Sequence, residues 1–271
     1  AILTYSDCQA TLMVGRGQRV TLDEQTHYPF GEDVLITVGG LGRKGSATFP
    51  LYLRIPAWTT DAHVQVNGQT IDCRPTQGLL CIRRTWKDGD RVQLYLPMRL
   101  SLRRWALNKN SVSVDYGPLT MSLLIRERRQ QADSRHTAIG DSHWQEEADA
   151  SQWPTTEIYA ASPWNYALVP CVKDMRVERT AWPQDNYPFA LESVPLRVKA
   201  SGALVPSWGQ DETGLCQVLP DACQPRGEVE QLTLIPMGAA RLRISAFPPC
   251  EENTACGQCG GGCGAAPMTE R

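Results

Sequence analysis

Four cysteines near the C-terminus have the spacing that most suggests chemistry in this sequence. Cys250, Cys256, Cys259 and Cys263 form a C-x5-C-x2-C-x3-C series. Four thiolates can hold Zn²⁺ tetrahedrally, and a C-x2-C pair is a common half of such a site. The second C-x2-C pair is missing, however, and the surrounding glycines raise the entropy cost of ordering. We therefore predict that residues 250–271 form a disordered Gly/Cys-rich tail, with a zinc or thiol-redox site as the alternative.

The spacing of the four histidines does not indicate a metal site. Only His136 and His143, with Asp141 between them, stand near one another in the chain, and His27 and His63 are isolated. None of these spacings places two ligands on one helix face or on one strand. We predict no histidine metal site.

Paired carboxylates are the groups that glycoside hydrolysis requires, one on each side of the scissile bond. The chain has 29 acidic residues, so proximity in sequence is a weak criterion. Glu146-Glu147 lies in a polar stretch, and Asp88 with Asp90 stands in a turn sequence, where both are expected to brace the backbone. We assign no catalytic residue.

Eight tryptophans raise the possibility of stacking on sugar rings. Trp164 and Trp208 are the candidates for carbohydrate contact, because both stand near predicted strand ends. The alternative is that they plug the core, which is the usual role of a tryptophan beside a backbone breaker.

Composition excludes some classes of partner. The formal net charge is −2 and the isoelectric point is near 6.1, so there is no basic field for nucleic acid or an anionic membrane. No apolar run reaches the roughly 20 residues that span a bilayer, and no signal peptide is recognisable, so the location is left open. Because the chain begins without Met in a predicted strand, we expect the natural protein to continue upstream.

Strand-period alternation is clearest in residues 49–100. Leu51, Leu53 and Ile55 fall on one face, and Pro56, which cannot donate to a ladder, ends the run. The region predicts a β-strand whose inward face includes Leu53.

Two hairpins are predicted to follow this strand. Residues 64–66 lead into Asn67-Gly68, a pair that tolerates the positive φ of a tight turn. Residues 80–86 alternate up to a turn at 87–90, and residues 92–96 resume the alternation.

The pattern by itself predicts a β-rich chain. Polar composition at 126–153 favours a long exposed loop.

Seven segments of the sequence resemble glycoside hydrolase family 127, the β-L-arabinofuranosidase-like proteins. They are FPLYLRIPAW, VQVNGQ, GLLCIRRTWKDGDRVQLYLPM, VDYGPL, SPWNYAL, PFALESVPLRVKASGALVPSW and LTLIPMGAARLRISAFP. The resemblance covers about residues 20–249. It implies an all-β fold of two β-sandwich domains, the second inserted in the first, that follow an (α/α) catalytic barrel absent from this chain. The expected domains are 1–124 (first sandwich), 125–227 (inserted second sandwich), 228–249 (strands returning to the first sandwich) and 250–271 (tail).

The family's catalytic groups have no counterpart here. The resemblance implies a Cys-Cys-Pro nucleophile segment, Glu and Cys ligands to Zn²⁺ and a Glu acid/base, all in the barrel, whereas this chain has no Cys-Cys pair. We therefore expect no cofactor in this chain, and an accessory region whose partners are the missing barrel and, through the second sandwich, another subunit in a homo-oligomer. The alternatives are a free-standing carbohydrate-binding β-sandwich module and a zinc- or thiol-active protein.

Overall fold

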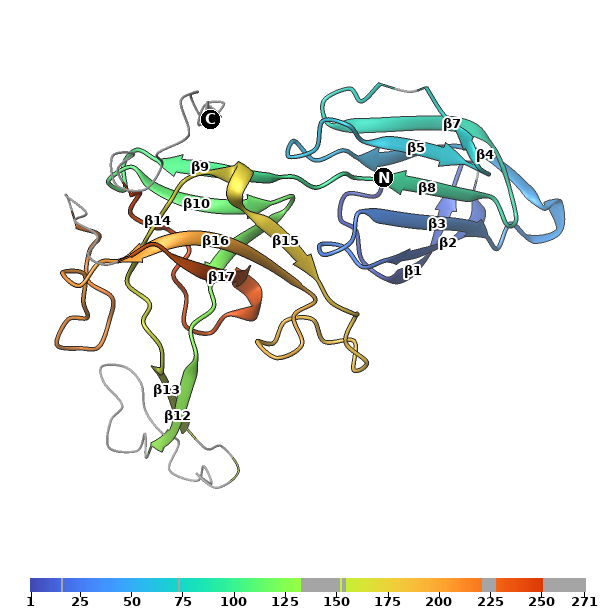
Figure 1. Cartoon of the computed structure of the whole chain (residues 1–271). Helices are drawn as coiled ribbons and strands as arrows, with labels where there is room; N and C mark the ends of the chain where they lie inside the picture. Colours follow the sequence, from blue (N-terminus) through green and yellow to red (C-terminus); the bar gives the residue numbers. More distant parts are fainter. Residues whose placement is uncertain (16, 73, 133–151, 153–154, 221–227, 251–271) are drawn as a thin grey trace. The chain divides into compact units, whose positions relative to one another are not determined.

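The computed structural model describes the whole chain except residues 16, 73, 133–151, 153–154, 221–227 and 251–271 (Figure 1). The described residues form β-strands and three single-turn 3₁₀ helices, with no α-helix among them. This confirms the predicted all-β class. The chain divides into two compact units, residues 1–100 with 115–119, and residues 101–114 with 120–271.

Seventeen strands make up the described structure. In chain order they are β1 (Cys8–Val14), β2 (Gln18–Thr26), β3 (Asp33–Gly39), β4 (Ser46–Arg54), β5 (His63–Val66), β6 (Gln69–Thr70), β7 (Leu79–Lys87), β8 (Arg91–Tyr95), β9 (Leu100–Trp105), β10 (Ser111–Tyr116), β11 (Leu119–Leu123), β12 (Glu127–Ala132), β13 (Thr155–Ala160), β14 (Tyr166–Leu168), β15 (Arg176–Arg179), β16 (Leu196–Leu204) and β17 (Glu230–Pro236).

The first unit is a sandwich of two antiparallel layers. The larger layer has six strands in the order β1-β2-β3-β8-β5-β6, and the smaller is the β4-β7 pair. Alternation places Val34 and Ile36 of β3 and Leu94 of β8 on the inner face of the larger layer, all of them fully buried. Leu53 of β4 and Trp86 of β7, both 0% exposed, meet this face from the smaller layer. The predicted inward position of Leu53 is confirmed.

One of the two predicted hairpins forms. Asn67 and Gly68 have φ of 51° and 78° and connect β5 to β6, as expected. The prediction that residues 80–96 form a second hairpin is wrong, because β7 pairs with β4, whereas β8 pairs with β3 and β5. The turn at 87–90 carries the chain from one layer to the other. Both strands keep the expected alternation because both border the same core.

The second unit is built on a seven-stranded sheet. Its order is β14-β16-β17-β11-β10-β9, and β15 pairs with β16 alongside β14. The segment after β17 forms backbone hydrogen bonds with two strands that lie far apart in this order, β10 and β14. Val112 of β10 and Phe247 exchange hydrogen bonds of 2.8 and 2.9 Å. The N–H of Leu168 in β14 donates to Pro248 O at 2.9 Å. Serine side chains secure the same segment, as Ser122 Oγ contacts both the N–H and the C=O of Ile244.

The strand order differs from the expected domain boundaries. We expected residues 1–124 to form the first sandwich, yet β10 and β11 belong to the seven-stranded sheet together with β16. Residues 228–249 do return to strands within the range 1–124, but those strands are β10 and β11. The sequence misplaces the boundary because strands on both sides of residue 100 have the same alternation.

A ribbon of two strands replaces part of the predicted loop. Residues 127–132 form β12, which pairs with β13 from Glu127↔Ala160 to Ala132↔Thr155. The predicted loop at 126–153 is therefore wrong at its beginning, where residues 127–132 form a strand. Residues 133–151 of that range lie outside the described part. Polar side chains are compatible with an exposed ribbon, and the Arg128 guanidinium lies 4.6 Å from the centroid of the Tyr159 ring.

Candidate functional site: a polar groove on the first unit

The predicted cysteine cluster is only partly within the described structure. Cys250 is described, whereas Cys256, Cys259 and Cys263 lie outside the described residues. Cys250 is 6% exposed, its backbone N–H donates to Leu168 O at 2.8 Å, and burial raises the pKa of its thiol. A buried neutral thiol is a poor metal ligand. Among the residues that the structure describes, no group of three or more His, Cys, Asp or Glu side chains could hold a metal ion.

The scattered cysteines outside the tail behave unequally. Cys171 is buried, and a hydrogen bond to Asp174, together with burial, raises the pKa of its thiol. Cys8 and Cys216 are exposed. Cys8 lies on β1, a sheet-edge strand that contributes little to the core.

The two predicted carbohydrate contacts pack against each other. The rings of Trp164 and Trp208 meet edge to face with centroids 5.2 Å apart. Trp208 is 2% exposed, and its indole N–H donates to Gln217 O at 2.8 Å. The ring of Trp208 therefore has no open face for a sugar. Carbohydrate contact through Trp164 stays a prediction.

A hollow lies on the outer face of the six-stranded sheet of the first unit. Its volume is about 930 Å³, and a smaller hollow of about 150 Å³ adjoins it and shares Asp33, Gln65 and Gln93. We call both together the groove. Its other lining residues are Asp7, Gln25, Thr26, His27, Leu35, His63, Asn67, Gly68, Arg91 and Tyr95.

Strand register explains how these residues come together. Gln25, Leu35, Gln93 and Gln65 are successive partners across β2, β3, β8 and β5. Each side chain follows a buried neighbour in its strand, so period two directs all four to the outer face. They form a continuous row across the groove floor.

A second row crosses the sheet beside the first. Asp33, Tyr95 and His63 are partners across β3, β8 and β5, and the rings of His63 and Tyr95 lie 4.9 Å apart. Tyr95 Oη donates to Glu32 Oε2 at 3.0 Å, and this bond raises the pKa of the phenol. Tyr95 is therefore held neutral with its ring facing outward.

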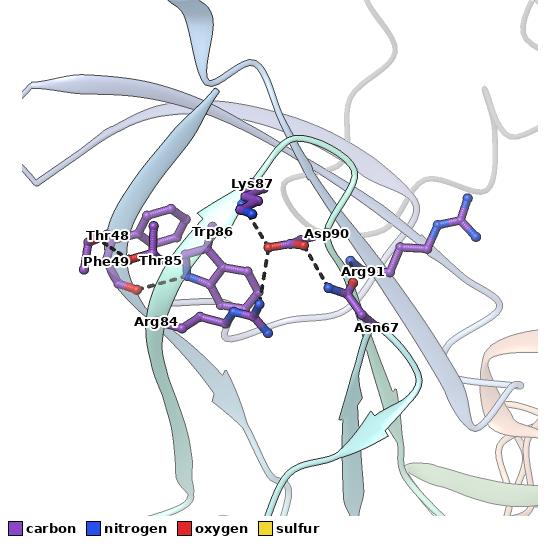
Figure 2. A network of polar contacts seen from close by, with 9 residues as sticks. All are labelled: Thr48, Phe49, Asn67, Arg84, Thr85, Trp86, Lys87, Asp90 and Arg91. Atoms are coloured by element: carbon purple, nitrogen blue, oxygen red, sulfur yellow. Dashed lines mark hydrogen bonds and ion pairs between the residues drawn. The ribbon is translucent and has the colours of Figure 1, made fainter. Parts of the chain in front are cut away.

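A buried carboxylate fixes the end of the groove (Figure 2). Asp90, 8% exposed, accepts from Asn67 Nδ2 at 2.8 Å and from Lys87 N–H at 2.9 Å, and its Oδ2 lies 3.8 Å from Arg84 Nη2. Burial opposes ionisation of Asp90, but these donors outweigh burial and lower its pKa. Asn67 Oδ1 also accepts from Arg91 N–H at 2.8 Å, so the Asn67 amide is occupied within the turn.

The neighbouring carboxylate braces the same turn. Asp88 Oδ1 accepts from Leu41 N–H at 3.0 Å. The interpretation of Asp88 and Asp90 as turn-building residues is therefore confirmed. We assign no catalytic residue in the groove.

The sequence did not single out the groove residues. Gln65 and Gln93 are ordinary outward positions of alternating strands, and their types carry no motif. The available signal is that most of the outward positions lining the groove carry an amide, carboxylate or aromatic side chain. These positions form a site only when the strand register aligns them.

Comparison with known proteins identifies the fold. The chain has the fold of three solved structures. One is a GH127 β-L-arabinofuranosidase from Geobacillus stearothermophilus T6, with 22% identity and a TM-score of 0.55 over 90% of this chain and 32% of that chain. The second, described as a glycoside hydrolase, has 20% identity and a TM-score of 0.55, with 90% and 34% covered. The third, a GH127 β-arabinofuranosidase, has 18% identity and a TM-score of 0.56, with 91% and 34% covered.

Residues 1–98 match the family model described as β-L-arabinofuranosidase, GH127 middle domain. The expected resemblance to the C-terminal β-sandwich region of glycoside hydrolase family 127 is thereby confirmed. No curated protein matches the chain. The chain spans about a third of the length of the solved structures.

Within the described ranges, no helix is long and apolar enough to cross a bilayer.

Proposed function

We propose that this chain is the non-catalytic accessory region of a GH127-like glycosidase, in which it supports a catalytic (α/α) barrel. The match of residues 1–98 to the GH127 middle domain carries the proposal. The parent enzyme then hydrolyses glycosidic bonds of the L-arabinofuranoside type, and its Zn²⁺ and nucleophile belong to the barrel. The second unit is proposed to contribute to a subunit contact.

An activity assay tests the non-catalytic part of this proposal. The isolated chain should show no turnover of aryl α- or β-L-arabinofuranosides with added Zn²⁺. A turnover that a point substitution within this chain abolishes would contradict the proposal.

The complete reading frame tests the accessory part. We expect it to encode, upstream of Ala1, a helical barrel with a Cys-Cys-Pro segment. Removal of residues 1–249 from that protein should lower the melting temperature of the barrel, because the sandwich would no longer cover its surface. A barrel that keeps its melting temperature and its activity without this region would refute the supporting role. Light scattering of the complete protein and of the protein without residues 1–249 would test the subunit contact.

A further inference from the structure

We propose that the groove on the six-stranded sheet binds a neutral oligosaccharide of two or three sugar units. This inference goes beyond the accessory role and does not depend on it. The groove lies wholly in the first unit, on the face of β2, β3, β8 and β5 that is turned away from the core.

Free amide groups at the centre of the groove supply the polar recognition. Gln65 and Gln93 are direct cross-strand partners, and within the described part of the chain neither side chain has a hydrogen-bond partner. Each amide offers two donors and an acceptor, which matches hydroxyl groups that both donate and accept. Side chains at opposed positions stand about 5 Å apart, so the pair can reach adjacent hydroxyl groups on one ring.

Apolar contacts on the same floor suit the C–H faces of sugars. Leu35 is half-buried beside Gln93, and the rings of His63 and Tyr95, tilted by 49° to each other, lie in the next row. Aromatic rings with a polar edge are typical of such surfaces. The volume of about 930 Å³ is within the range of roughly 300–1,000 Å³ that holds small organic ligands.

The charges of the groove favour an uncharged ligand. Asp7 and Asp33 carry two formal negative charges and Arg91 one positive charge, which leaves −1 when His27 and His63 are counted as neutral. Asp7 is already bound, since its Oδ1 accepts from Thr26 N–H at 2.6 Å. A polyanion would meet net repulsion here, and a polycation would find no concentrated negative field.

A protein partner fits this surface less well. The centre of a protein interface is typically rich in aromatic side chains and Met. The centre of the groove is instead a row of glutamines around one leucine. We therefore commit to the saccharide and make protein contact an outcome of the test.

Affinity electrophoresis of the whole chain provides the test. Native gels containing branched arabinan, arabinogalactan or xylan serve as neutral probes, and polygalacturonate serves as the anionic probe. We expect at least one neutral polysaccharide to retard the chain and polygalacturonate to leave it unretarded. The variant Q65A/Q93A should weaken binding about tenfold, because two hydrogen-bonding amides are lost.

A matched variant controls for a general effect on the sheet. Gln9 lies on β1 of the same sheet outside the groove, so Q9A should bind as the unchanged chain does. Circular dichroism melts confirm that all variants fold. Equal binding by Q65A/Q93A, equal loss by Q9A, or no retardation by any neutral polysaccharide would overturn the proposal, and the last result would favour a protein contact on this face.

Discussion

Asn67 and Asp90 join two turns that are 23 residues apart in the chain. Asn67 Nδ2 donates to Asp90 Oδ1 at 2.8 Å, and Asn67 Oδ1 accepts from Arg91 N–H at the same distance. The pair ties the β5–β6 turn to the turn between β7 and β8 (Figure 2). These hydrogen bonds connect the turn at 87–90, where the chain passes from one layer to the other, with Asn67 at the end of the groove.

Removal of the Asp90 carboxylate should destabilise the first unit. We expect D90A to lower the free energy of unfolding by about 3 kcal/mol, since hydrogen bonds to a buried charged group are lost and Arg84 keeps no partner in the turn. Urea unfolding of D90A, N67A and the double variant would measure the coupling. Additive effects of the two single changes would show that the pair does not act as a unit.

The contribution of Asp90 should depend on pH in a defined direction. Its folded-state pKa is lowered below the unfolded value of about 3.9, so the ionised carboxylate stabilises the fold fully above that pH. The stabilisation is lost as pH falls through the folded-state pKa. The difference in unfolding free energy between the unchanged chain and D90A should therefore shrink below about pH 4.

Asp72 supplies the control for this pH series. It is exposed and outside the Asp90 network, so D72A should change stability little at any pH. A difference between the unchanged chain and D90A that stays constant from pH 7 to pH 3 would contradict the prediction.

The inward faces of the first unit were predictable, but the pairing of its strands was not. Period-two alternation depends only on which side of a strand is buried, so Leu53 and Trp86 could be placed from sequence. Hairpin signals are equally local, and the turn at 87–90 has the residues of a hairpin although it joins two layers. Which partner β7 takes depends on contacts with residues 46–54, and these have no local signal.

The groove escaped prediction for a related physical reason. Outward residues are free to vary unless a ligand constrains them, so their pattern carries no period beyond that of the strand. Gln65 and Gln93 become neighbours only through the β5–β8 register. By contrast, the conspicuous Trp208 proved to be a core residue, because a large ring gains more by burial than by exposure.

The substitution L53D should unfold the first unit. Leu53 is 0% exposed, and an unpaired carboxylate would replace a side chain whose burial contributes roughly 1.5–3 kcal/mol. Thermal melting followed by near-ultraviolet circular dichroism should lose the signal of the packed Trp86. The control L3D alters a leucine that is 54% exposed and should melt as the unchanged chain does. An unchanged melt of L53D would mean that this side chain does not support the core.

A serine fixes the segment after β17, and its removal should loosen that segment. Ser122 is 0% exposed, accepts from Ile244 N–H at 3.1 Å and lies 3.2 Å from Ile244 O. S122A leaves the Ile244 N–H without its acceptor, so we expect a loss of about 1–3 kcal/mol. Amide hydrogen exchange should accelerate at Leu123, whose N–H donates to Ile244 O.

An exposed serine of the same unit tests whether this effect is specific. Ser101 lies on β9 with an exposed side chain, so S101A should leave exchange at Leu123 unchanged. Equal acceleration in both variants, or none in S122A, would show that the Ser122 hydroxyl does not hold the segment.

We expect Cys250, but not the residues after it, to contribute to the stability of the fold. The sequence predicts that the disordered tail begins at residue 250, but Cys250 is buried and its N–H donates to Leu168 O at 2.8 Å. We now expect deletion of 251–271 to change the free energy of unfolding by less than about 0.5 kcal/mol, the usual scale for surface changes. Deletion of 250–271 should cost about 1–2 kcal/mol more, since a buried hydrogen bond and a buried side chain are lost.

Metal analysis of the purified chain decides the alternative role of this region. Burial raises the pKa of the Cys250 thiol, so a site of four thiolates would require Cys250 to leave its packed position. We expect less than stoichiometric zinc by plasma mass spectrometry and no change in melting temperature with a chelator. Stoichiometric zinc that is lost together with stability on deletion of 251–271 would instead establish a structural metal site, because metal binding would then contribute folding free energy.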